Sequence, residues 1–458
     1  MTPIIVFMLI LGYLLIATGH LTGVNKAAIA MFIGTVGWVI YVSWGTDFVM
    51  QLHPDEYAAY LNGEEATSRL VKQFIHQEIF LYYVGRAAAI VMFLLATMSI
   101  VDLLQGNGCF DFISHWTRTR SSRQMLWSLT LLTFVLSANL DNLSAATMML
   151  VAMHAVVRSR RQRMLIGASI VIAANCGGCF TVIGDATGLI IWGDGAVSAT
   201  NFSAYLLLPA FIAYIVPTIF ISRMLPSRLD TEWSAPPYRG DDTRLNNWQR
   251  LLMLFVGIGG LWFIPTFYNI TGLSPFLGAL CVLAVLWVVN EIVNRKSIQA
   301  NQMTARRMPE ALQYGTMQQI LFVMGIMLSM GVLTESGVLG SIAQWLLDHV
   351  GNLWLLAVGA GLLSAIVDTF TIAVTNISLF TLQASGDFAQ NGIYWKLIAY
   401  ATAVGGNLLL IGSTSGLALM KMEQMHLGWY LKNIAPKVLA GFLLGLAVLY
   451  AEYSLNIL

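Results

Sequence analysis

The chain has 458 residues, of which 57% are hydrophobic and 10% are charged, with a formal net charge of +1. A soluble domain of this size needs far more charged surface, and the mean hydropathy of +0.71 therefore excludes one. The near-zero net charge gives no sign of a nucleic-acid partner, and none is expected.

Apolar runs of about 20 residues, enough to cross roughly 30 Å of hydrocarbon, recur along the whole chain. They predict an all-α polytopic protein whose immediate partner is membrane lipid. The first spans are expected at 3–20 and 27–45, followed by a polar segment at 46–78, a span at 79–101 and an interfacial helix at 102–117. The first run lacks a basic leader and a cleavage site, which favours a span of the mature protein over a signal peptide.

The stretch 125–157 is apolar and has arginine clusters on both sides. As one helix it would be about 50 Å long, which exceeds the hydrocarbon core. It would also place arginines on both sides of the membrane, against the positive-inside rule. The pattern therefore predicts a re-entrant hairpin open to the cytoplasm, with the tip SANLDN at 137–142.

The rest of the chain predicts a second set of similar elements. In order, the expected elements are a broken span at 164–194, a span at 203–222, a hydrophilic linker at 223–249, spans at 250–268 and 274–293, a basic stretch at 294–313, a span at 315–334, an interfacial helix at 337–349, a hairpin at 351–382, a broken span at 393–420 and a last span at 433–453. The hairpin at 351–382 has acidic flanks, which favours opening to the periplasm.

The basic residues orient the chain. Apart from Arg69, Lys72, Arg86 and Lys396, the 24 lysines and arginines fall on one side of this arrangement. The positive-inside rule makes that side cytoplasmic and places both termini in the periplasm.

Three blocks of sequence match at a nearly constant offset. SANLDNLSAATMMLV from Ser137 aligns with SAIVDTFTIAVTNIS from Ser364, and GGCFTVIGDATG from Gly177 aligns with GGNLLLIGSTSG from Gly405. A third block, ending at Trp116, aligns with one ending at Trp345. The matches predict a first repeat at 1–222, a cytoplasmic linker at 223–249 and a second, inverted repeat at 250–458, each with a hairpin and a discontinuous helix.

Acidic residues deep in apolar segments are the candidate functional groups, because a buried charge is costly in a membrane. Asp141 and Asp368 occupy equivalent hairpin tips, and Asp185 lies in the first broken span. Short oxygen-bearing side chains surround them, and such ligands suit a hard cation such as Na⁺. The predicted cation and proton site comprises Ser137, Asn139, Asp141, Asn142, Thr181, Asp185, Ser364, Asp368, Thr369, Ser413 and Thr414. Na⁺ itself is expected at Asp141 and Asp368.

Other reactive side chains are interpreted as structural. Cys176 and Cys179 form a C-x-x-C pattern without a basic neighbour, which favours packing over redox or metal chemistry. His154, near the inner end of the first hairpin, is interpreted as an interfacial side chain.

The chain resembles the NhaD type of sodium/proton antiporter in the ion-transporter superfamily. The resemblance rests on HLTGVNKAAIAM, SANLDNLSAATMM, ANCGGCFTVIGDATG, LIAYATAVGGNLLLIGSTSGLALM and WYLKNIAPKVLAGFLLGLAVLY. It implies a homodimer with a scaffold part and a transport part in each protomer, and exchange of Na⁺ or Li⁺ for H⁺. The second tip departs from the family pattern, because Thr369 and Thr371 stand where the family has asparagine and proline.

The sequence therefore predicts a secondary transporter without cofactor in a bacterial inner membrane, serving pH homeostasis by exchanging Na⁺ for H⁺. The alternative is an anion permease of the same fold that carries a carboxylate or arsenite with sodium. An enzyme is not expected, because no H-E-x-x-H or G-x-G-D pattern supplies a hydrolytic pair.

Overall fold

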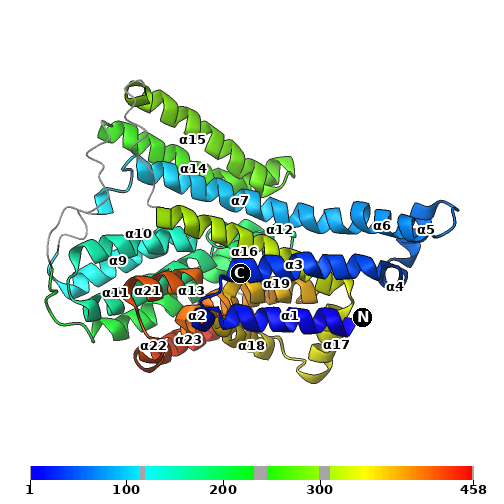
Figure 1. The fold of residues 1–458 in the computed structure, drawn as a ribbon. Coiled ribbons are helices and arrows are strands. Elements are labelled where there is room, and N and C mark those ends of the chain that lie inside the picture. The colour runs from blue at the N-terminus through cyan, green and yellow to red at the C-terminus, as the bar shows by residue number, and fades with distance from the viewer. Residues whose placement is uncertain (1, 114–118, 232–244, 299–309, 456–458) are drawn as a thin grey trace. The chain divides into compact units, whose positions relative to one another are not determined.

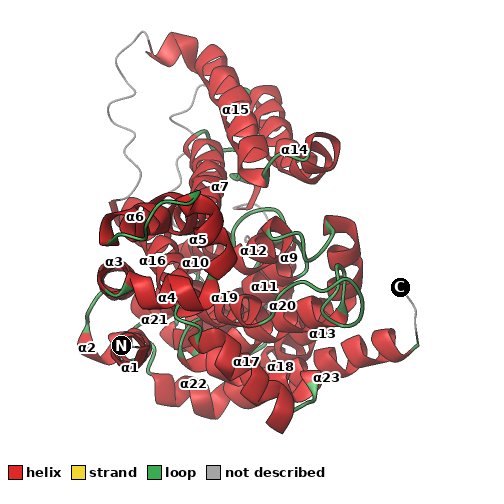
Figure 2. Ribbon diagram, turned by 90° about the vertical axis from the view of Figure 1, so that its right-hand side faces the viewer, coloured by secondary structure: helices red, strands yellow, loops and turns green. Residues whose placement is uncertain are grey.

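The computed structural model describes residues 2–113, 119–231, 245–298 and 310–455. Within these ranges the chain forms helices and loops with a few isolated β-bridges and no strand (Figure 2). Seven of the described helices are long and apolar enough to cross a membrane. The predicted all-α polytopic fold is thereby confirmed.

The chain divides into two compact units. Unit 1 comprises Met1–Val91, Tyr314–Leu356 and Val374–Thr381, and unit 2 comprises Met92–Gln313, Ala357–Ala373 and Leu382–Leu458. Both units combine segments that are distant in the sequence, as the colours of Figure 1 show.

Unit 1 begins with the two predicted N-terminal spans. Its elements are α1 (Thr2–Ala17), α2 (Gly19–Thr22), α3 (Lys26–Ser43), α4 (Gly45–Leu52), α5 (Pro54–Leu61), α6 (Ser68–Phe74), the π-helix η1 (Ile75–Phe80), the start of α7 (Leu81–Gly106), most of α16 (Glu310–Glu335) and α17 (Val338–His349). The polar segment at 46–78 is thus largely helical. The interfacial helix expected from residue 102 is wrong at its start, because α7 continues to Gly106 without a break; residues 114–118 lie outside the described ranges.

Small residues bring α3 and α16 together in unit 1. A β-carbon added at Gly34 would lie 2.8 Å from the carbonyl oxygen of Gly325, so the two backbones are nearly in contact. The indole of Trp38 donates a 3.0 Å hydrogen bond to the carbonyl oxygen of Leu328. Close packing through glycine is typical of helices in membranes.

Unit 2 contains the first predicted hairpin and both predicted broken spans. Its elements are the remainder of α7, α9 (Ser122–Ser137), α10 (Asn142–Val156), α11 (Arg160–Cys179), α12 (Ala186–Gly193), α13 (Ala199–Ser222), α14 (Asn247–Thr271), α15 (Pro275–Ile298), α20 (Ile393–Gly405), the 3₁₀ turns η4 (Gly406–Leu408) and η5 (Leu410–Gly412), α21 (Thr414–Glu423), α22 (Leu427–Asn433) and α23 (Ala435–Ser454).

The second hairpin is formed by α18 (Leu353–Ile366) and α19 (Thr369–Leu379), and the chain around its tip, Ala357–Ala373, belongs to unit 2. The core of unit 2 is the interrupted helix α11, in which every residue from Met164 to Cys179 is buried. Helices α9, α10, α13, α20 and α21 all pack against α11. The structure therefore contains two helix pairs and two interrupted helices at the predicted positions.

Candidate functional site

Asp141, at the first hairpin tip, is 6% exposed and accepts the hydrogen bonds that hold the start of α10. Its carboxylate accepts hydrogen bonds from the backbone nitrogens of Leu143 and Ser144, both at 3.0 Å, and from the Ser144 hydroxyl at 2.5 Å. Asp141 is therefore the N-cap of α10, which satisfies amide groups that the first helical turn leaves without a partner. Oδ2 accepts two of these hydrogen bonds and Oδ1 accepts one, so Oδ1 keeps a lone pair that can bind a cation.

Asn142 connects this tip to the first interrupted helix. Its amide nitrogen lies 3.4 Å from Oδ1 of Asn175 in α11 and 3.4 Å from Oδ1 of Asp185 in the break. Asn139, although predicted with it, faces elsewhere: its amide donates to the carbonyl of Val135, and its oxygen accepts from the indole of Trp262.

Asn175 is the centre of a buried polar network that the sequence analysis did not single out. Its amide nitrogen donates to Oδ1 of Asn407 at 2.8 Å and to Oγ of Ser413 at 2.9 Å. Its oxygen accepts from Oγ of Ser415 at 2.8 Å. None of these four side chains is more than 1% exposed. The network joins the two interrupted helices, one from each half of the sequence.

The two carboxylate oxygens of Asp185 have different surroundings. Its Oδ1 faces Asn142, whereas Oδ2 is buried and has no hydrogen-bond partner in the described part of the chain. The side chain of Thr187, two residues further on, and the backbone nitrogen of Ala186 interact with the Asp185 carboxylate. The charges of Asp141 and Asp368 both act on Asp185. Because a buried charge in an apolar protein interior is costly, a proton or a cation bound at Asp185 would offset that cost.

The second hairpin tip resembles the first in its geometry. Oδ1 of Asp368 accepts from the backbone nitrogens of Phe370 at 3.0 Å and Thr371 at 3.4 Å, at the start of α19. Asp368 is 2% exposed. Thr369, which follows it as Asn142 follows Asp141, directs its methyl group toward Gly406. The second tip therefore repeats the aspartate cap but not the amide bridge.

Three other predicted site residues bind backbone carbonyls. Ser137 donates to the carbonyl of Ala174 at 2.6 Å, and Ser364 donates to that of Thr402 at 2.7 Å, so the same contact occurs in both halves. Thr181 donates to the carbonyl of Ala138 at 2.6 Å. These hydroxyls attach each hairpin to its interrupted helix.

The last two predicted residues lie at the start of α21. Ser413 is the N-cap of this helix and accepts from the backbone nitrogen of Gly416 at 3.1 Å. Thr414 is its first residue and is half-buried.

Glycines allow the hairpins to approach the interrupted helices closely. A β-carbon at Gly405 would lie 2.5 Å from the carbonyl oxygen of Gly361, and one at the equivalent Gly177 would collide with the carbonyl of Phe134. A β-carbon at Gly184 would lie 2.5 Å from the carbonyl of Ser137. Backbone thus packs directly on backbone next to both tips.

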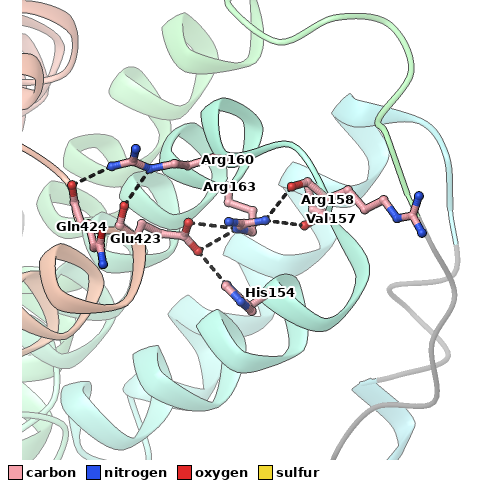
Figure 3. Close-up of polar contacts among 7 residues, drawn as sticks. All are labelled: His154, Val157, Arg158, Arg160, Arg163, Glu423 and Gln424. Carbon is pink, nitrogen blue, oxygen red and sulfur yellow. Dashed lines mark hydrogen bonds and ion pairs between the residues drawn. The ribbon is translucent and has the colours of Figure 1, made fainter.

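A charged cluster joins α10, α11 and the end of α21 (Figure 3). The fully buried carboxylate of Glu423 accepts from Nε of Arg163 at 2.9 Å and lies 2.8 Å from Nδ1 of His154. Arg160 donates to the carbonyl oxygens of Glu423 at 3.0 Å and Gln424 at 2.7 Å. The interpretation of His154 as an interfacial side chain was therefore incomplete. The position of Glu423 near the end of an apolar segment was the sequence feature that could have indicated an ion pair here.

Within the described residues, no three His, Cys, Asp or Glu side chains converge as a metal site. A cation would instead need one or two carboxylates supplemented by amide, hydroxyl and carbonyl oxygens. The structure brings Asp141, Asn142, Asp185 and Ser413 together with Asn175, and the charge of Asp368 reaches this group. Such an oxygen-rich, partly unpaired centre can bind a small hard cation or a proton.

Comparison with known proteins places this architecture among transporters. The family described as "Citrate transporter" (CitMHS) matches residues 2–300. The chain is 32% identical over 81% of its length to "Sodium/proton antiporter 1" of Arabidopsis thaliana, of which it covers 63%. It is 29% identical over 97% of its length to "Sodium/proton antiporter 2" of the same plant, of which it covers 98%. With "Na(+)/H(+) antiporter NhaD" of Vibrio cholerae it shares 25% identity over 85% of its length and 82% of that protein.

Two solved structures share the fold. The YdaH transporter of Alcanivorax borkumensis aligns with a TM-score of 0.56 and 14% identity, covering 91% of this chain and 98% of that one. MtrF of Neisseria gonorrhoeae aligns with a TM-score of 0.50 and 13% identity, covering 89% of this chain and 94% of that one. At these identities the likeness concerns the fold alone.

Proposed function

Since the chain belongs to the citrate transporter family, as an NhaD-type member of the ion-transporter superfamily, we propose that it exchanges Na⁺ for H⁺ by alternating access. One observation carries the proposal: the carboxylate of Asp185 is buried, and its Oδ1 lies beside an amide network that reaches the Asp141 tip. Three relatives at 25–32% identity are named as sodium/proton antiporters, which supports the proposal. Li⁺, with the same charge and ligand preference, is a second expected substrate.

Competition for one site explains the coupling. Removal from water disfavours a charged carboxylate, so Asp185 binds a proton in this proposal when no cation is present. Bound Na⁺ favours the charged carboxylates and displaces that proton. Because proton and cation are alternative occupants, one must leave before the other enters, and exchange becomes obligatory. Asp368 provides the corresponding group at the second tip.

The test compares single Asp→Asn variants in proteoliposomes with a sodium gradient and a pH-sensitive dye. Asp141→Asn keeps an oxygen that can cap α10 but loses the charge, so we expect a folded protein without exchange. Asp185→Asn should behave in the same way. Asp194→Asn, the same change at the exposed end of α12, is the matched control and should exchange normally. Full pH-dependent exchange by Asp141→Asn would refute the shared site.

A sodium-coupled carboxylate permease is the second candidate, because the matching family is described as a citrate transporter. The side chains gathered at the tips and breaks are acidic or neutral, which disfavours a bare anionic substrate there. Citrate uptake, measured in the same proteoliposomes under a sodium gradient, distinguishes the two functions. Sodium-dependent citrate uptake without proton exchange would favour the permease.

The proposal extends to the assembly. A transporter of this kind would lie in a bacterial inner membrane with both termini in the periplasm and its repeats inverted. It would form a homodimer through the scaffold spans at 27–101 and 250–334, because moving parts need a fixed partner surface. Cross-linking in native membranes that yields only monomer would contradict the dimer.

A further inference from the structure

A second buried carboxylate lies in unit 1, where Glu335 ends α16. Its side chain is 8% exposed. Its Oε1 accepts from the hydroxyl of Tyr83 at 2.7 Å, and its Oε2 accepts from the more distant hydroxyl of Tyr41 at 3.4 Å. Oε2 also lies 2.8 Å from Nε2 of His53, at the junction of α4 and α5. Groups from separate helices of unit 1 therefore converge on one carboxylate.

His53 lies between two carboxylates. Its Nε2 faces Glu335 at 2.8 Å and its Nδ1 faces Glu56 at 2.6 Å. An ionised carboxylate only accepts hydrogen bonds, and a neutral imidazole has only one N–H to donate. Both short contacts are satisfied only if one additional proton is present, either on the ring or on one of the two carboxylates. The geometry of His53 and its two carboxylate neighbours therefore favours the binding of one additional proton.

The titration of His53 follows from the same contacts. Burial lowers the pKa of His53, but the hydrogen bonds to Glu335 and Glu56 and their charges outweigh burial, so the pKa is raised above the ordinary 6.5. Because the pKa is raised, the protonated contact contributes its full stabilisation at pH values below the ordinary pKa of 6.5. That stabilisation is lost as the pH rises through the pKa of His53 in the folded protein.

A cavity of about 570 Å³ gives this proton access to solvent. Glu335 and His53 line it, together with Glu78 of η1 and the rings of Tyr60 and Tyr82. The wall includes part of a π-helix, an irregularity that occurs often at functional sites. The other charged groups near the cluster are Glu56 and Arg86, the latter acting on Tyr83.

We propose that His53 and Glu335 form a proton-binding site separate from the hairpin aspartates, and that loss of this proton releases α4 and α5 from the end of α16. With the proton present, His53 links Glu56 of α5 to Glu335. Without it, a ring lone pair faces a carboxylate oxygen at under 3 Å, and one of the two contacts must open. The site therefore makes the contact between residues 45–61 and the end of α16 dependent on pH. This inference does not depend on which substrate the protein transports.

Hydrogen exchange measured by mass spectrometry on the full-length protein in nanodiscs tests this site without any transport assay. After correction for the intrinsic pH dependence of exchange, protection of residues 45–61 in the wild type should fall by up to about tenfold per pH unit above 6.5, the slope for one proton. His53→Gln has no titratable ring and cannot hold the additional proton between the two carboxylates, so its protection should be low and independent of pH. His76→Gln, an exposed histidine on η1, is the matched control and should keep the wild-type profile.

A second variant keeps the test decisive if His53→Gln fails to fold. Glu56 is 71% exposed, so Glu56→Gln should fold normally. It removes one charge that raises the pKa of His53 in the folded state, so the fall in protection should end at a lower pH and be smaller in total. A wild-type profile without a pH step, or a step that neither His53→Gln nor Glu56→Gln alters, would overturn the proposal.

Discussion

Replacing Asn175 with alanine tests the network that joins the two interrupted helices. Three short hydrogen bonds are lost, to Asn407 at 2.8 Å, to Ser413 at 2.9 Å and from Ser415 at 2.8 Å. The 3.4 Å contact with Asn142 is too long to add much. Side-chain hydrogen bonds in membrane proteins contribute about 0.6 kcal/mol each, so the three amount to about 2 kcal/mol. This corresponds to about a 30-fold change in the unfolding equilibrium.

Reversible unfolding in mixed micelles measures this change. Ser169→Ala is the matched control, because Ser169 is equally buried in α11 but donates only to the carbonyl of Leu165 in its own helix, at 3.3 Å. We expect the control to lose no more than about 0.6 kcal/mol, the value of one such bond. If Asn175→Ala is no more destabilising than Ser169→Ala, the network does not hold the interrupted helices together.

Further predictions concern the other features. Glu423→Gln removes the charge that faces the half-buried Arg163, and should lower the free energy of unfolding by about 2 kcal/mol, read from the same unfolding curves; an unchanged curve would mean that the ion pair contributes nothing. Gly184→Ala should abolish exchange in proteoliposomes by displacing the first tip, whereas Gly193→Ala, whose β-carbon meets nothing within 4 Å, should exchange normally. Single cysteines at Ser159 and Ser385, in a background without native cysteines, should react with an impermeant reagent from opposite faces, and labelling from the same face would contradict the inverted repeat.

The helix pairs were predictable because their signals are local. An apolar stretch too long for one span, with an aspartate near its middle, indicates a break, and the breaks occur at Asp141 and Asp368 as expected. The short helices α4 and α5 gave no such signal, since eight-residue amphipathic helices contain no long apolar run. Their stability depends on tertiary contacts such as that between His53 and Glu335.

The candidate site was predictable only in part, because only some of its residues have a local signal in the sequence. A charge within an apolar segment identifies Asp141, Asp185 and Asp368. Asn175 and Asn407 are uncharged, and they meet only because the fold brings positions 232 residues apart into contact. The amide of Asn139, in contrast, has the right composition but bonds to Val135 and Trp262, because a side chain at a tight tip can face either side.

The glycine contacts beside the two tips have a mechanical consequence. Where Gly177 meets Phe134 and Gly405 meets Gly361, main chain rests on main chain, with no side chain between them to change rotamer and absorb a displacement. The first arm of each hairpin therefore cannot slide along its interrupted helix by small adjustments. Any motion of unit 2 must carry hairpin and interrupted helix together, so the distances among the oxygen atoms at the tips are preserved while the site as a whole is displaced.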